Sequence, residues 1–297
     1  MRRAALLPEQ APAKINLTLH INGRRDDGYH DLESLVVFAD IGDTLALAPS
    51  DTLSLVTSGP TAQVAGPLED NLVIKAARAL QARFDGLFVG TFDLVKHLPV
   101  AAGIGGGSAD AAAAIRLLCR LNGLPLHDIR VQEAARAVGA DVPVCLESQA
   151  RIMKGAGERL GPPLRLPRLQ AVLVNPGVPV PTAAVFKALG LNPGEKCTGV
   201  PHVAIESTPD VATLLALLQA SRNDLQAAAI AVEPVIADVI DQISRQNGCA
   251  LARMSGSGAT CFGLFDSLGS VFEAVRALRR HRSNWWVQPV TLGSLEN

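Results

Sequence analysis

The chain has 297 residues, and its 27 basic and 28 acidic side chains leave a formal net charge of −1 at pH 7. This length is enough for one large domain or for two ordinary domains, each with a core of its own. Hydrophobic residues account for 48% of the chain and charged residues for 19%, a composition that excludes a disordered protein. The near-neutral balance also lacks the positive charge that is typical of nucleic-acid-binding proteins.

The five cysteines are odd in number and widely spread, and no two of them form a C-x-x-C pair. This pattern predicts neither a disulfide framework nor a zinc site. The basic start of the chain is followed by an apolar run that is too short for a signal peptide. No stretch approaches the roughly 18 apolar residues that a membrane span needs. We therefore expect a reduced, soluble, cytoplasmic protein that does not bind membranes.

The amino-terminal part of the chain carries mainly strand patterns. In residues 13–21, apolar residues alternate with polar ones, and this period of two predicts a half-buried strand. The segment 71–84 instead has apolar residues at helical spacing, which predicts a helix. Further strands are predicted at 33–39, 44–48, 52–57 and 91–97.

Strands and helices continue along the remainder of the chain without strict alternation. An alanine-rich helix follows residue 109, and residues 150–165, which include three glycines and a Pro-Pro pair, are the best candidate for a linker. Other helices are predicted at 131–138, 210–220, 222–232, 233–247 and 270–281, and strands at 170–176 and on both sides of a turn within 250–265. This mixture favours an α+β protein with two lobes, residues 1–166 and residues 167–297.

Four glycines lie within residues 103–107, between a predicted strand and the alanine-rich helix. Glycine lets the backbone approach a ligand closely, and successive amide N–H groups at a helix start form an anion site. The segment is not a P-loop, because the required lysine is missing, and its third Rossmann glycine would fall on Ser108. A tight turn without a ligand would need fewer glycines. We therefore expect a phosphate site, with Ser108 placed either to cap the helix or to offer its hydroxyl to a metal ion bound by the phosphate.

Two neighbouring features leave more than one interpretation open. Asp110 lies in the first turn of the helix, where we expect it to complement the helix dipole; beside a phosphate it would be repelled unless Mg²⁺ intervened. A second glycine turn, at residues 255–259, joins two predicted strands. This turn is either a plain hairpin of small residues or a segment that closes over the ligand of the first glycine segment.

Lys14, Asn16 and Asp141 are candidate functional residues with ordinary alternatives. Lys14 and Asn16 project from the polar face of the first strand and reach a ligand if that face lines a cleft. Otherwise, Lys14 is an exposed lysine on an edge strand. Asp141 follows Gly139 and precedes Pro143, a pattern that also suits the N-cap of a short helix. Spacing alone does not bring Lys14 and Asp141 together.

Three separated segments resemble the motifs of the GHMP kinases. They are APAKINLTLHI at 11–21, LPVAAGIGGGSADAA at 98–112 and MSGSGATCF at 254–262. The resemblance is closer to those members whose alcohol substrate is linked to cytidine diphosphate, on the evidence of RRDDGYHDLES at 24–34, GADVPV at 139–144 and NPGVPVPTAAVF at 175–186. It covers most of the chain from residue 11 to residue 265.

The resemblance implies a fold, an activity and several site residues. The fold would combine an amino-terminal lobe like the second domain of a ribosomal small-subunit protein with a ferredoxin-like carboxyl-terminal lobe. The activity would be ATP-dependent phosphorylation of a hydroxyl on a cytidine-linked alcohol of the non-mevalonate isoprenoid pathway. By motif, Asp141 would be the base, Lys14 would keep it ionised, and Asn71 would lie near adenine. The ATP phosphates would be cradled by Pro99, Val100, Ala101, Ala102, Gly103, Ile104, Gly105, Gly106, Gly107, Ser108 and Ala109.

The resemblance also implies how the cytidine group would be bound. Tyr29 and Phe186 would sandwich the cytosine, His30 would hydrogen-bond to its edge, and Asn16 and Thr182 would adjoin the rest of the substrate. Considered alone, His30 and Phe186 are more often core or capping residues, and the family resemblance reverses that preference.

The resemblance implies ATP and Mg²⁺ as cofactors. We expect a monomer or weak homodimer, and the near-neutral charge predicts that it binds no nucleic acid. The sequence shows no dedicated acidic cage for a metal. Two rival functions remain: a kinase for another small alcohol, or a non-catalytic nucleotide- or RNA-binding module. The basic run Arg276–Arg282 beside Trp285 bears on the second, but it ends a predicted helix, where cations are favoured. We therefore interpret the run as a solvated helix face.

Overall fold

The computed structural model describes residues 7–62, 68–202, 204–205 and 209–293. Its residues form two compact units that interleave along the chain. The first unit contains Met1–Ala13, Ile41–Val100 and Gly105–Ser148, and the second contains Lys14–Asp40, Ala101–Ile104 and Gln149–Asn297. Strands β1 (Leu7–Asn16) and β3 (His30–Ser50) each contribute residues to both units. The continuous division between residues 166 and 167 stays a prediction.

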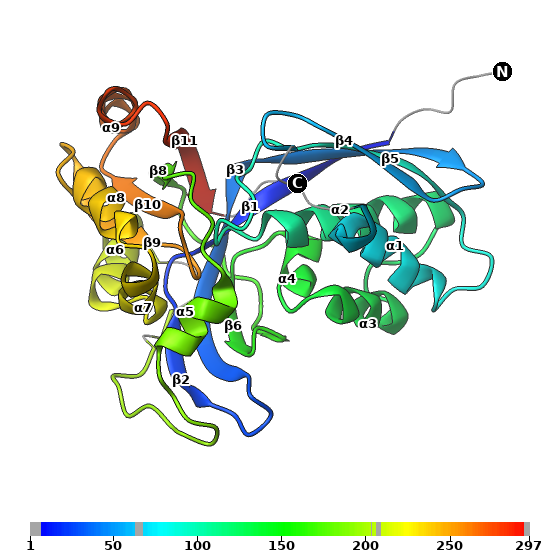
Figure 1. Cartoon of the computed structure of the whole chain (residues 1–297), viewed down its shortest axis with the longest axis horizontal. Helices are drawn as coiled ribbons and strands as arrows, with labels where there is room; N and C mark the ends of the chain where they lie inside the picture. The colour runs from blue at the N-terminus through cyan, green and yellow to red at the C-terminus, as the bar shows by residue number, and fades with distance from the viewer. Residues whose placement is uncertain (1–6, 63–67, 203, 206–208, 294–297) are drawn as a thin grey trace. The chain divides into compact units, whose positions relative to one another are not determined.

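In the first unit, four helices lie beside strands β4, β5 and the second half of β3 (Figure 1). Strand β5 (Val89–Val95) pairs in parallel with β4 (Ser54–Ser58) and antiparallel with residues 44–50 of β3. A short 3-10 helix, η2 (Leu68–Asp70), precedes the first α-helix. The α-helices are α1 (Leu72–Gln81), α2 (Gly106–Asn122), α3 (Ile129–Val138) and α4 (Val142–Glu147).

Local chemistry explains where these helices begin and end. The side chain of Asn71 accepts a hydrogen bond from the Val73 amide, at 2.9 Å, and so caps α1. Asp128 caps α3 in the same way, through the amide of Arg130. Helix α2 ends at Gly123, whose φ of +65° is the left-handed conformation that glycine adopts readily. The alanine-rich side of α2 is buried, which allows the neighbouring helices to pack closely.

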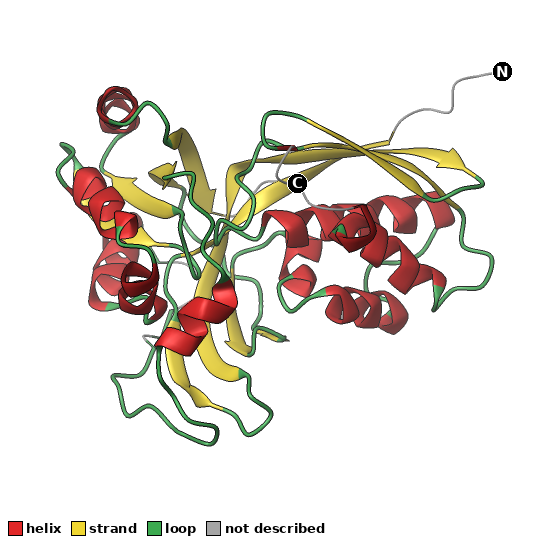
Figure 2. Ribbon diagram, in the orientation of Figure 1, coloured by secondary structure: helices red, strands yellow, loops and turns green. Residues whose placement is uncertain are grey.

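The second unit is built on antiparallel strands (Figure 2). Strand β8 (Leu169–Asn175) pairs with β10 (Cys261–Phe265) on one side and with β11 (Trp286–Gly293) on the other, and β10 also pairs with β9 (Cys249–Met254). The first part of β3 pairs with β2 (His20–Arg24) and with β6 (Arg151–Gly155), which is joined to β7 (Arg159–Leu160). The helices are α5 (Thr182–Ala188), α6 (Val211–Ala220), α7 (Leu225–Val232), α8 (Val235–Ser244) and α9 (Leu268–His281).

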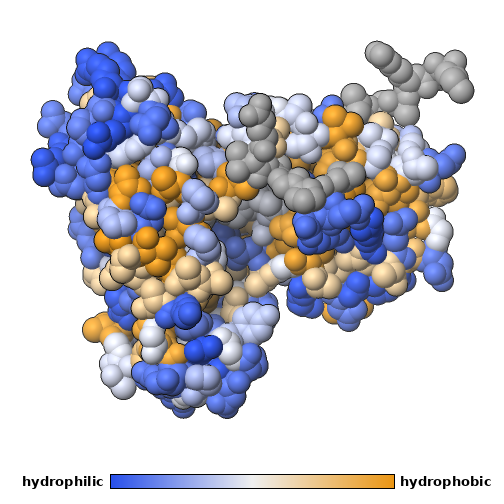
Figure 3. Space-filling view, in the orientation of Figure 1, coloured by the Kyte–Doolittle hydropathy of each residue, from blue (hydrophilic) through white to orange (hydrophobic). Residues whose placement is uncertain are grey.

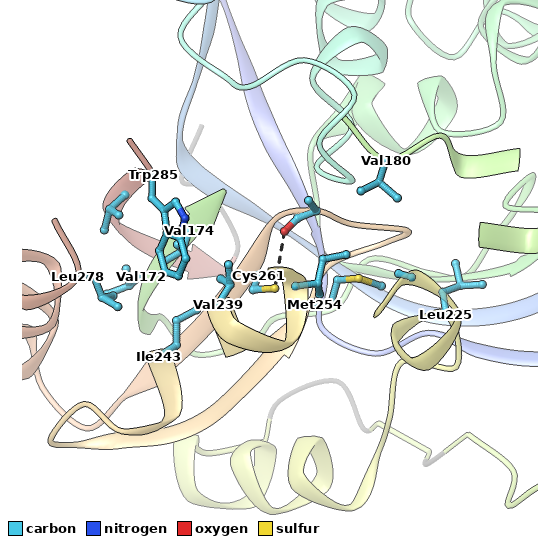
Figure 4. Close-up of a cluster of buried hydrophobic side chains, with 14 of the residues drawn as sticks. Val172, Val174, Val180, Leu225, Val239, Ile243, Met254, Cys261, Leu278 and Trp285 are labelled. Atoms are coloured by element: carbon cyan, nitrogen blue, oxygen red, sulfur yellow. Dashed lines mark hydrogen bonds between the residues drawn. The ribbon is translucent and has the colours of Figure 1, made fainter. Parts of the chain in front are cut away.

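Aliphatic side chains from strands and helices form the core of the second unit. Val172 and Val174 of β8 meet Val239 of α8 and Leu278 of α9 in this cluster (Figure 4). Burial of a side chain of this size contributes about 1.5–3 kcal/mol. The same cluster includes Met254, which precedes the second glycine turn, and Ala259, the last residue of that turn. The core therefore supports that turn from behind.

Three sequence-based expectations about elements are wrong. Residues 150–165 are not a linker, because β6 pairs with β3 over residues 151–155. The predicted strands at 33–39 and 44–48 are one continuous strand, β3. The predicted strand at 13–21 is interrupted between β1 and β2, and it is buried on both faces rather than half-buried.

Strand β11 was not predicted from the sequence, because its Pro289 argues against a strand. The structure tolerates this proline because β11 pairs with β3 only at Leu292 and Gly293, beyond Pro289. The α+β class is confirmed by the mixture of strands and helices in both units. In the described part of the chain, no helix has both the length and the apolar character needed to cross a membrane.

Candidate functional site

The first glycine segment opens helix α2 in the first unit. Gly105 is the N-cap, with a left-handed φ of +63°, and as a glycine it provides no side-chain capping hydrogen bond at this end. Ser108 lies inside the first turn, so the expectation that it caps the helix is wrong. An uncapped start of a 17-residue helix presents backbone N–H groups and the positive end of the helix dipole. This arrangement suits an anion such as phosphate.

Three charged side chains are buried beneath the start of α2. The ammonium group of Lys96 donates a hydrogen bond to Asp110 Oδ2, at 2.6 Å, and another to Asp43 Oδ2. Asp43 Oδ1 also accepts from the backbone amides of His97 and Leu98, at 2.6 and 2.9 Å. A Cβ built on Gly106 would lie 3.7 Å from Asp43 Oδ2, which places the cluster directly under the glycine segment.

This charged cluster contains two acids and one base. Asp110 Oδ1 is buried and has no hydrogen-bond partner among the described residues. Burial raises the pKa of Asp110 to about 7, although the attraction of Lys96 opposes the rise. The carboxylates raise the pKa of Lys96 despite the opposing effect of its burial, so that the ammonium form persists. The expectation that Asp110 lies in the first turn of α2 and complements the helix dipole is wrong, because no acidic residue lies in that turn. Asp110 instead belongs to the buried ionic cluster.

Asn71 and Asp141 both occupy N-cap positions in the first unit. Asn71 caps α1 with its own side chain, as described above. Asp141 precedes α4, and Pro143 lies in the first turn of that helix. Asp141 is half-buried, and its side chain makes no capping hydrogen bond to α4. The predicted cap position is therefore confirmed, whereas the predicted capping hydrogen bond is absent.

In the second unit, Lys14 and Asn16 are both buried, at 4% exposure. The alternative of an exposed lysine on an edge strand is therefore wrong for Lys14. The Lys14 amide donates to the carbonyl of Ile104, at 3.0 Å, and the Asn16 amide donates to Ser255 Oγ, at 3.1 Å. Strand β1 is thus bonded to Ile104 in the first glycine segment and to Ser255 in the second glycine turn.

The second glycine turn packs against residues 101–104 backbone to backbone. A Cβ on Gly103 would lie 2.6 Å from the Ser255 carbonyl oxygen, and a Cβ on Gly256 would lie 2.7 Å from the Gly103 carbonyl oxygen. Real Cβ atoms do not approach other atoms so closely, so both positions require glycine. Ser255 Oγ donates to the Gly103 carbonyl, at 3.1 Å, and the Thr260 amide donates to Ala102, at 3.0 Å. The turn is a hairpin between β9 and β10 that also holds the first glycine segment.

The side-chain amide of Asn16 is oriented by its neighbours. Ser34 Oγ donates its hydrogen to the Thr18 carbonyl, at 2.5 Å, and it must therefore accept a hydrogen from Asn16, at 2.7 Å. This requirement leaves Asn16 Oδ1 facing the other way, where it is buried without a hydrogen-bond partner among the described residues. Thr182 Oγ1 lies 2.9 Å from Ser257 Oγ, which places Thr182 at the second glycine turn.

His30 and Phe186 form an aromatic pair in the second unit, with ring centroids 4.7 Å apart and an angle of 35° between the ring planes. Partial burial lowers the pKa of His30, and the positive charge of Arg24 adds to this effect. His30 Nε2 is buried without a hydrogen-bond partner among the described residues. Tyr29 precedes His30 on an exposed turn and is itself 64% exposed.

The basic run at residues 276–282 lies at the end of α9, as predicted. Its arginines are exposed, and hydrophilic side chains cover the surface over α9 in Figure 3. Arg279 donates to the Val287 carbonyl, at 2.6 Å, and Arg282 pairs with Asp238, at 3.1 Å. These contacts confirm a solvated helix face in which two of the arginines brace neighbouring elements.

Family models match the chain in both halves. The model of the GHMP kinases N terminal domain matches residues 71–149, and the model described as GHMP kinases C terminal matches residues 203–284. The first match contains the start of α2 and Asp141, and the second contains the second glycine turn. This chain belongs to the GHMP kinase family.

Relatives and solved structures agree with this family. A 4-diphosphocytidyl-2-C-methyl-D-erythritol kinase of Methylobacterium radiotolerans is 58% identical over 97% of this chain and 99% of its own length. The enzyme of the same name from Methylorubrum extorquens is 57% identical over the same shares of the two chains. A crystal structure of 4-(cytidine 5'-diphospho)-2C-methyl-D-erythritol kinase matches with a TM-score of 0.71 and 32% identity, over 97% of this chain and 100% of that one.

More distant structures match this GHMP kinase in fold alone. The structure of a mevalonate kinase from L. major matches with a TM-score of 0.67 at 15% identity, over 99% of this chain and 100% of the other. The predicted GHMP kinase fold is therefore confirmed.

Within the described residues, no group of three or more His, Cys, Asp or Glu side chains could hold a metal ion.

Sequence reasoning missed several residues that organise the sites of this GHMP kinase. Asp43, Lys96 and Ser34 became visible only in the structure, because their partners are distant in the sequence. Asn223 was placed within a predicted helix, yet it lies between α6 and α7 and bonds to the second glycine turn. For Lys96, the only signal in the sequence was that lysine is scarce, since the chain contains six lysines. No comparable signal pointed to the other residues.

Proposed function

We propose that this GHMP kinase transfers the γ-phosphoryl group of ATP to the 2-hydroxyl of 4-diphosphocytidyl-2-C-methyl-D-erythritol, in non-mevalonate isoprenoid precursor biosynthesis. Two relatives that are 57% and 58% identical to this chain bear the name of that activity. The structural observation that carries the proposal is the pairing of His30 with Phe186, which leaves one buried ring nitrogen without a partner. Such a nitrogen beside an aromatic ring suits recognition of a flat base by its edge.

We assign the chemistry of the transfer to Asp141 and Lys14. Asp141 accepts the proton of the attacking hydroxyl as the new O–P bond forms and ADP leaves. Lys14 supplies a positive charge that balances the charge of the transferred group. Phosphoryl transfer depends mainly on positioning and charge stabilisation, so a moderate base is sufficient.

Residues 99–109 are the proposed cradle for the ATP phosphates. The uncapped start of α2 and its two neighbouring glycines support this role, since backbone N–H groups bind phosphate oxygens. Asn71, at the start of α1, is the proposed neighbour of adenine. Magnesium suits this site as an ion carried by the nucleotide's own phosphate oxygens, because such ions are commonly held by substrate phosphates with few protein ligands.

The cytidine group is proposed to bind at Tyr29, His30 and Phe186. The lowered pKa of His30 favours a neutral imidazole at pH 7, which can donate from one nitrogen and accept at the other. Tyr29 is exposed and adjoins His30 in sequence, so its ring is available to cover the second face of a base. Asn16 Oδ1 and Thr182 are proposed to contact the methylerythritol diphosphate, where a hydroxyl would satisfy the open acceptor of Asn16.

An ADP-release assay with several alcohols tests the proposal. The purified chain is mixed with ATP, Mg²⁺ and either the cytidine-linked alcohol, mevalonate, homoserine or galactose. We expect ADP release with the cytidine-linked alcohol and at most about a hundredth of that rate with the others, because they lack the base. Equal rates with mevalonate or homoserine would assign the enzyme to another branch of the family.

A Phe186→Leu variant tests the cytidine site itself. Leucine retains much of the packing of Phe186 against the core but removes the ring, so we expect the KM for the cytidine-linked alcohol to rise about tenfold. The KM for ATP should stay within a factor of two. Phe88→Leu is the matched control, because Phe88 is 71% exposed and belongs to the first unit. An equal rise in both KM values would contradict the assigned site.

A further inference from the structure

Asn223 lies at a junction of three segments in the second unit, where it is 7% exposed. Its neighbours in the chain are bonded to the β1–β2 connection: the Leu19 amide donates to the Arg222 carbonyl, at 2.9 Å, and the Asp224 amide donates to the Leu19 carbonyl, at 2.8 Å. Asp224 Oδ2 also accepts from the Ile21 amide, at 2.7 Å. The backbone on both sides of Asn223 is therefore held in place.

The side chain of Asn223 uses both of its N–H hydrogens and its carbonyl oxygen in hydrogen bonds. Its Nδ2 group donates to the carbonyls of Met254 and Gly256, at 2.8 and 2.9 Å. Its Oδ1 accepts from the Leu225 amide, at 3.0 Å. A primary amide supplies this combination of two N–H hydrogens and a carbonyl acceptor, whereas a carboxylate supplies acceptors only. Both donated bonds end on the second glycine turn or on the residue just before it.

That turn leaves no space between itself and residues 101–104. The Gly103 and Gly256 backbones meet without room for a Cβ on either residue, and Ser255 Oγ bonds to the Gly103 carbonyl. The Lys14 amide is bonded to Ile104 and the Asn16 amide to Ser255. Since these backbones are in direct contact, a shift of the turn moves residues 101–104 with it.

We propose that Asn223 is a positioning residue for phosphoryl transfer, which holds the second glycine turn so that residues 101–104 keep the geometry needed to bind ATP. This inference rests on the proposed kinase function. Misplacement of reacting groups by about 1 Å can cost about a hundredfold in rate. Asn223 therefore acts on the nucleotide through the turn and does not itself touch the reacting atoms.

The variant Asn223→Asp separates this role from simple helix capping. Aspartate has nearly the same shape and keeps the acceptor for the Leu225 amide, but it loses both donors to the turn. Asn122 of the first unit offers a matched control, because its Nδ2 donates to the carbonyls of Phe88 and Leu118 and its Oδ1 accepts from the Phe88 amide. Asn122→Asp removes the same two kinds of bond away from the glycine turn.

The readouts are the dissociation constant for ATP by calorimetry, both KM values, kcat, and the melting temperature of each variant. We expect Asn223→Asp to weaken ATP binding and to lower kcat/KM for ATP, each by about tenfold or more. The KM for the cytidine-linked alcohol should rise less than the KM for ATP, because the turn reaches the proposed alcohol site only through its bonds to Asn16 and Thr182. Asn122→Asp should leave the ATP dissociation constant, both KM values and kcat within a factor of two. All assays are run at least 15 °C below the lowest melting temperature, a margin of about two destabilising substitutions.

Unchanged ATP binding and kcat/KM in folded Asn223→Asp would overturn the inference, because capping alone would then account for Asn223. If wild-type enzyme did not phosphorylate the cytidine-linked alcohol, the proposed function would fail, while ATP binding would still test Asn223. Should Asn223→Asp fail to fold, Asn223→Ser combined with Ser255→Ala provides a second test. Because both residues act through one turn, their losses of ATP affinity should be less than additive. Full additivity would contradict the proposal.

Discussion

The two units of this chain bury polar side chains in different ways. In the first unit, Lys96 lies between Asp43 and Asp110, and the three side chains form a buried ionic cluster. In the second unit, Asn16 and Ser34 form a cluster of neutral hydrogen bonds. Each cluster leaves one buried oxygen without a hydrogen-bond partner among the described residues, Asp110 Oδ1 in the first and Asn16 Oδ1 in the second.

The two clusters therefore differ in how much stability is lost when one member loses its partner. A buried charge left without its partner is expensive, and its cost depends on pH. A neutral hydroxyl or amide costs less to leave unpaired, and its contribution does not change with pH. We therefore expect the charged cluster to respond strongly to neutralisation and titration, and the neutral cluster to respond weakly to both.

The largest expected effect comes from Asp141→Asn, which removes a charge of the first unit from the proposed chemistry. The amide cannot accept the proton of the attacking hydroxyl, so kcat should fall by about a hundredfold to ten-thousandfold. Steady-state assays together with ATP calorimetry measure this change, and the ATP dissociation constant should stay within about a factor of three. A variant with near-normal kcat would show that Asp141 is not the base.

Lys96→Met should be the most destabilising change among those in the two clusters. It leaves the carboxylates of Asp43 and Asp110 buried without their counter-ion, and the free energy of unfolding should fall by about 3–5 kcal/mol. Urea denaturation followed by circular dichroism measures the loss. Lys154→Met is the control, because Lys154 pairs with Glu33 at 3.0 Å but is 52% exposed, and it should cost less than about 1 kcal/mol. Equal losses in the two variants would refute the special role of the buried cluster.

Ser34→Ala tests the neutral cluster in the same denaturation experiment. The variant leaves Asn16 Nδ2 and the Thr18 carbonyl without their partner, and we expect a loss of about 1–3 kcal/mol. The loss should be the same at pH 6 and pH 8, because the Ser34 hydroxyl, the Asn16 amide and the Thr18 carbonyl do not titrate in this range. Ser50→Ala removes an exposed hydroxyl and should change stability by less than about 0.5 kcal/mol. A loss from Ser34→Ala that varies with pH would contradict the claim that the neutral cluster contributes to stability independently of pH.

The charged cluster is also tested by the pH dependence of stability in Asp110→Asn. Folding raises the pKa of Asp110 from its ordinary 3.8 to about 7, so the folded state binds more protons than the unfolded state between these values. The contribution of Asp110 to the free energy of unfolding is therefore present below its ordinary pKa and is lost as pH rises through about 7. Wild type should lose stability relative to Asp110→Asn between pH 5 and pH 8. A constant difference across this range would contradict the raised pKa.

The sequence predicted the elements whose pattern is local. Helix α1 and strands β4, β5 and β8 lie where hydrophobic periodicity indicated them, because burial of one face imposes that period. Strand β11 and the pairing of residues 151–155 were missed, because a proline in one and glycines around the other outweighed the pattern. Both segments are strands because they pair with strands that are distant in the sequence.

The motifs of the candidate site could be predicted from the sequence, but the residues that orient the site side chains could not. The glycine segment, Lys14 and Asn16 were selected from residue spacing and strand pattern. His30 and Phe186 were selected by motif resemblance, and the structure pairs them. The partners that orient them come from distant parts of the chain: Ser34 orients Asn16, and Asn223 bonds to the second glycine turn. Such pairs depend on the folded backbone, and a single sequence contains no signal of which distant residues meet.

Product analysis by phosphorus NMR tests the central claim most directly. Wild-type enzyme is incubated with ATP, Mg²⁺ and 4-diphosphocytidyl-2-C-methyl-D-erythritol, and the phosphorus signals are followed with time. The account predicts that ADP and a new phosphomonoester on the 2-hydroxyl appear in equal amounts and at equal rates. ADP accompanied by inorganic phosphate, or a phosphomonoester on a different hydroxyl, would contradict it.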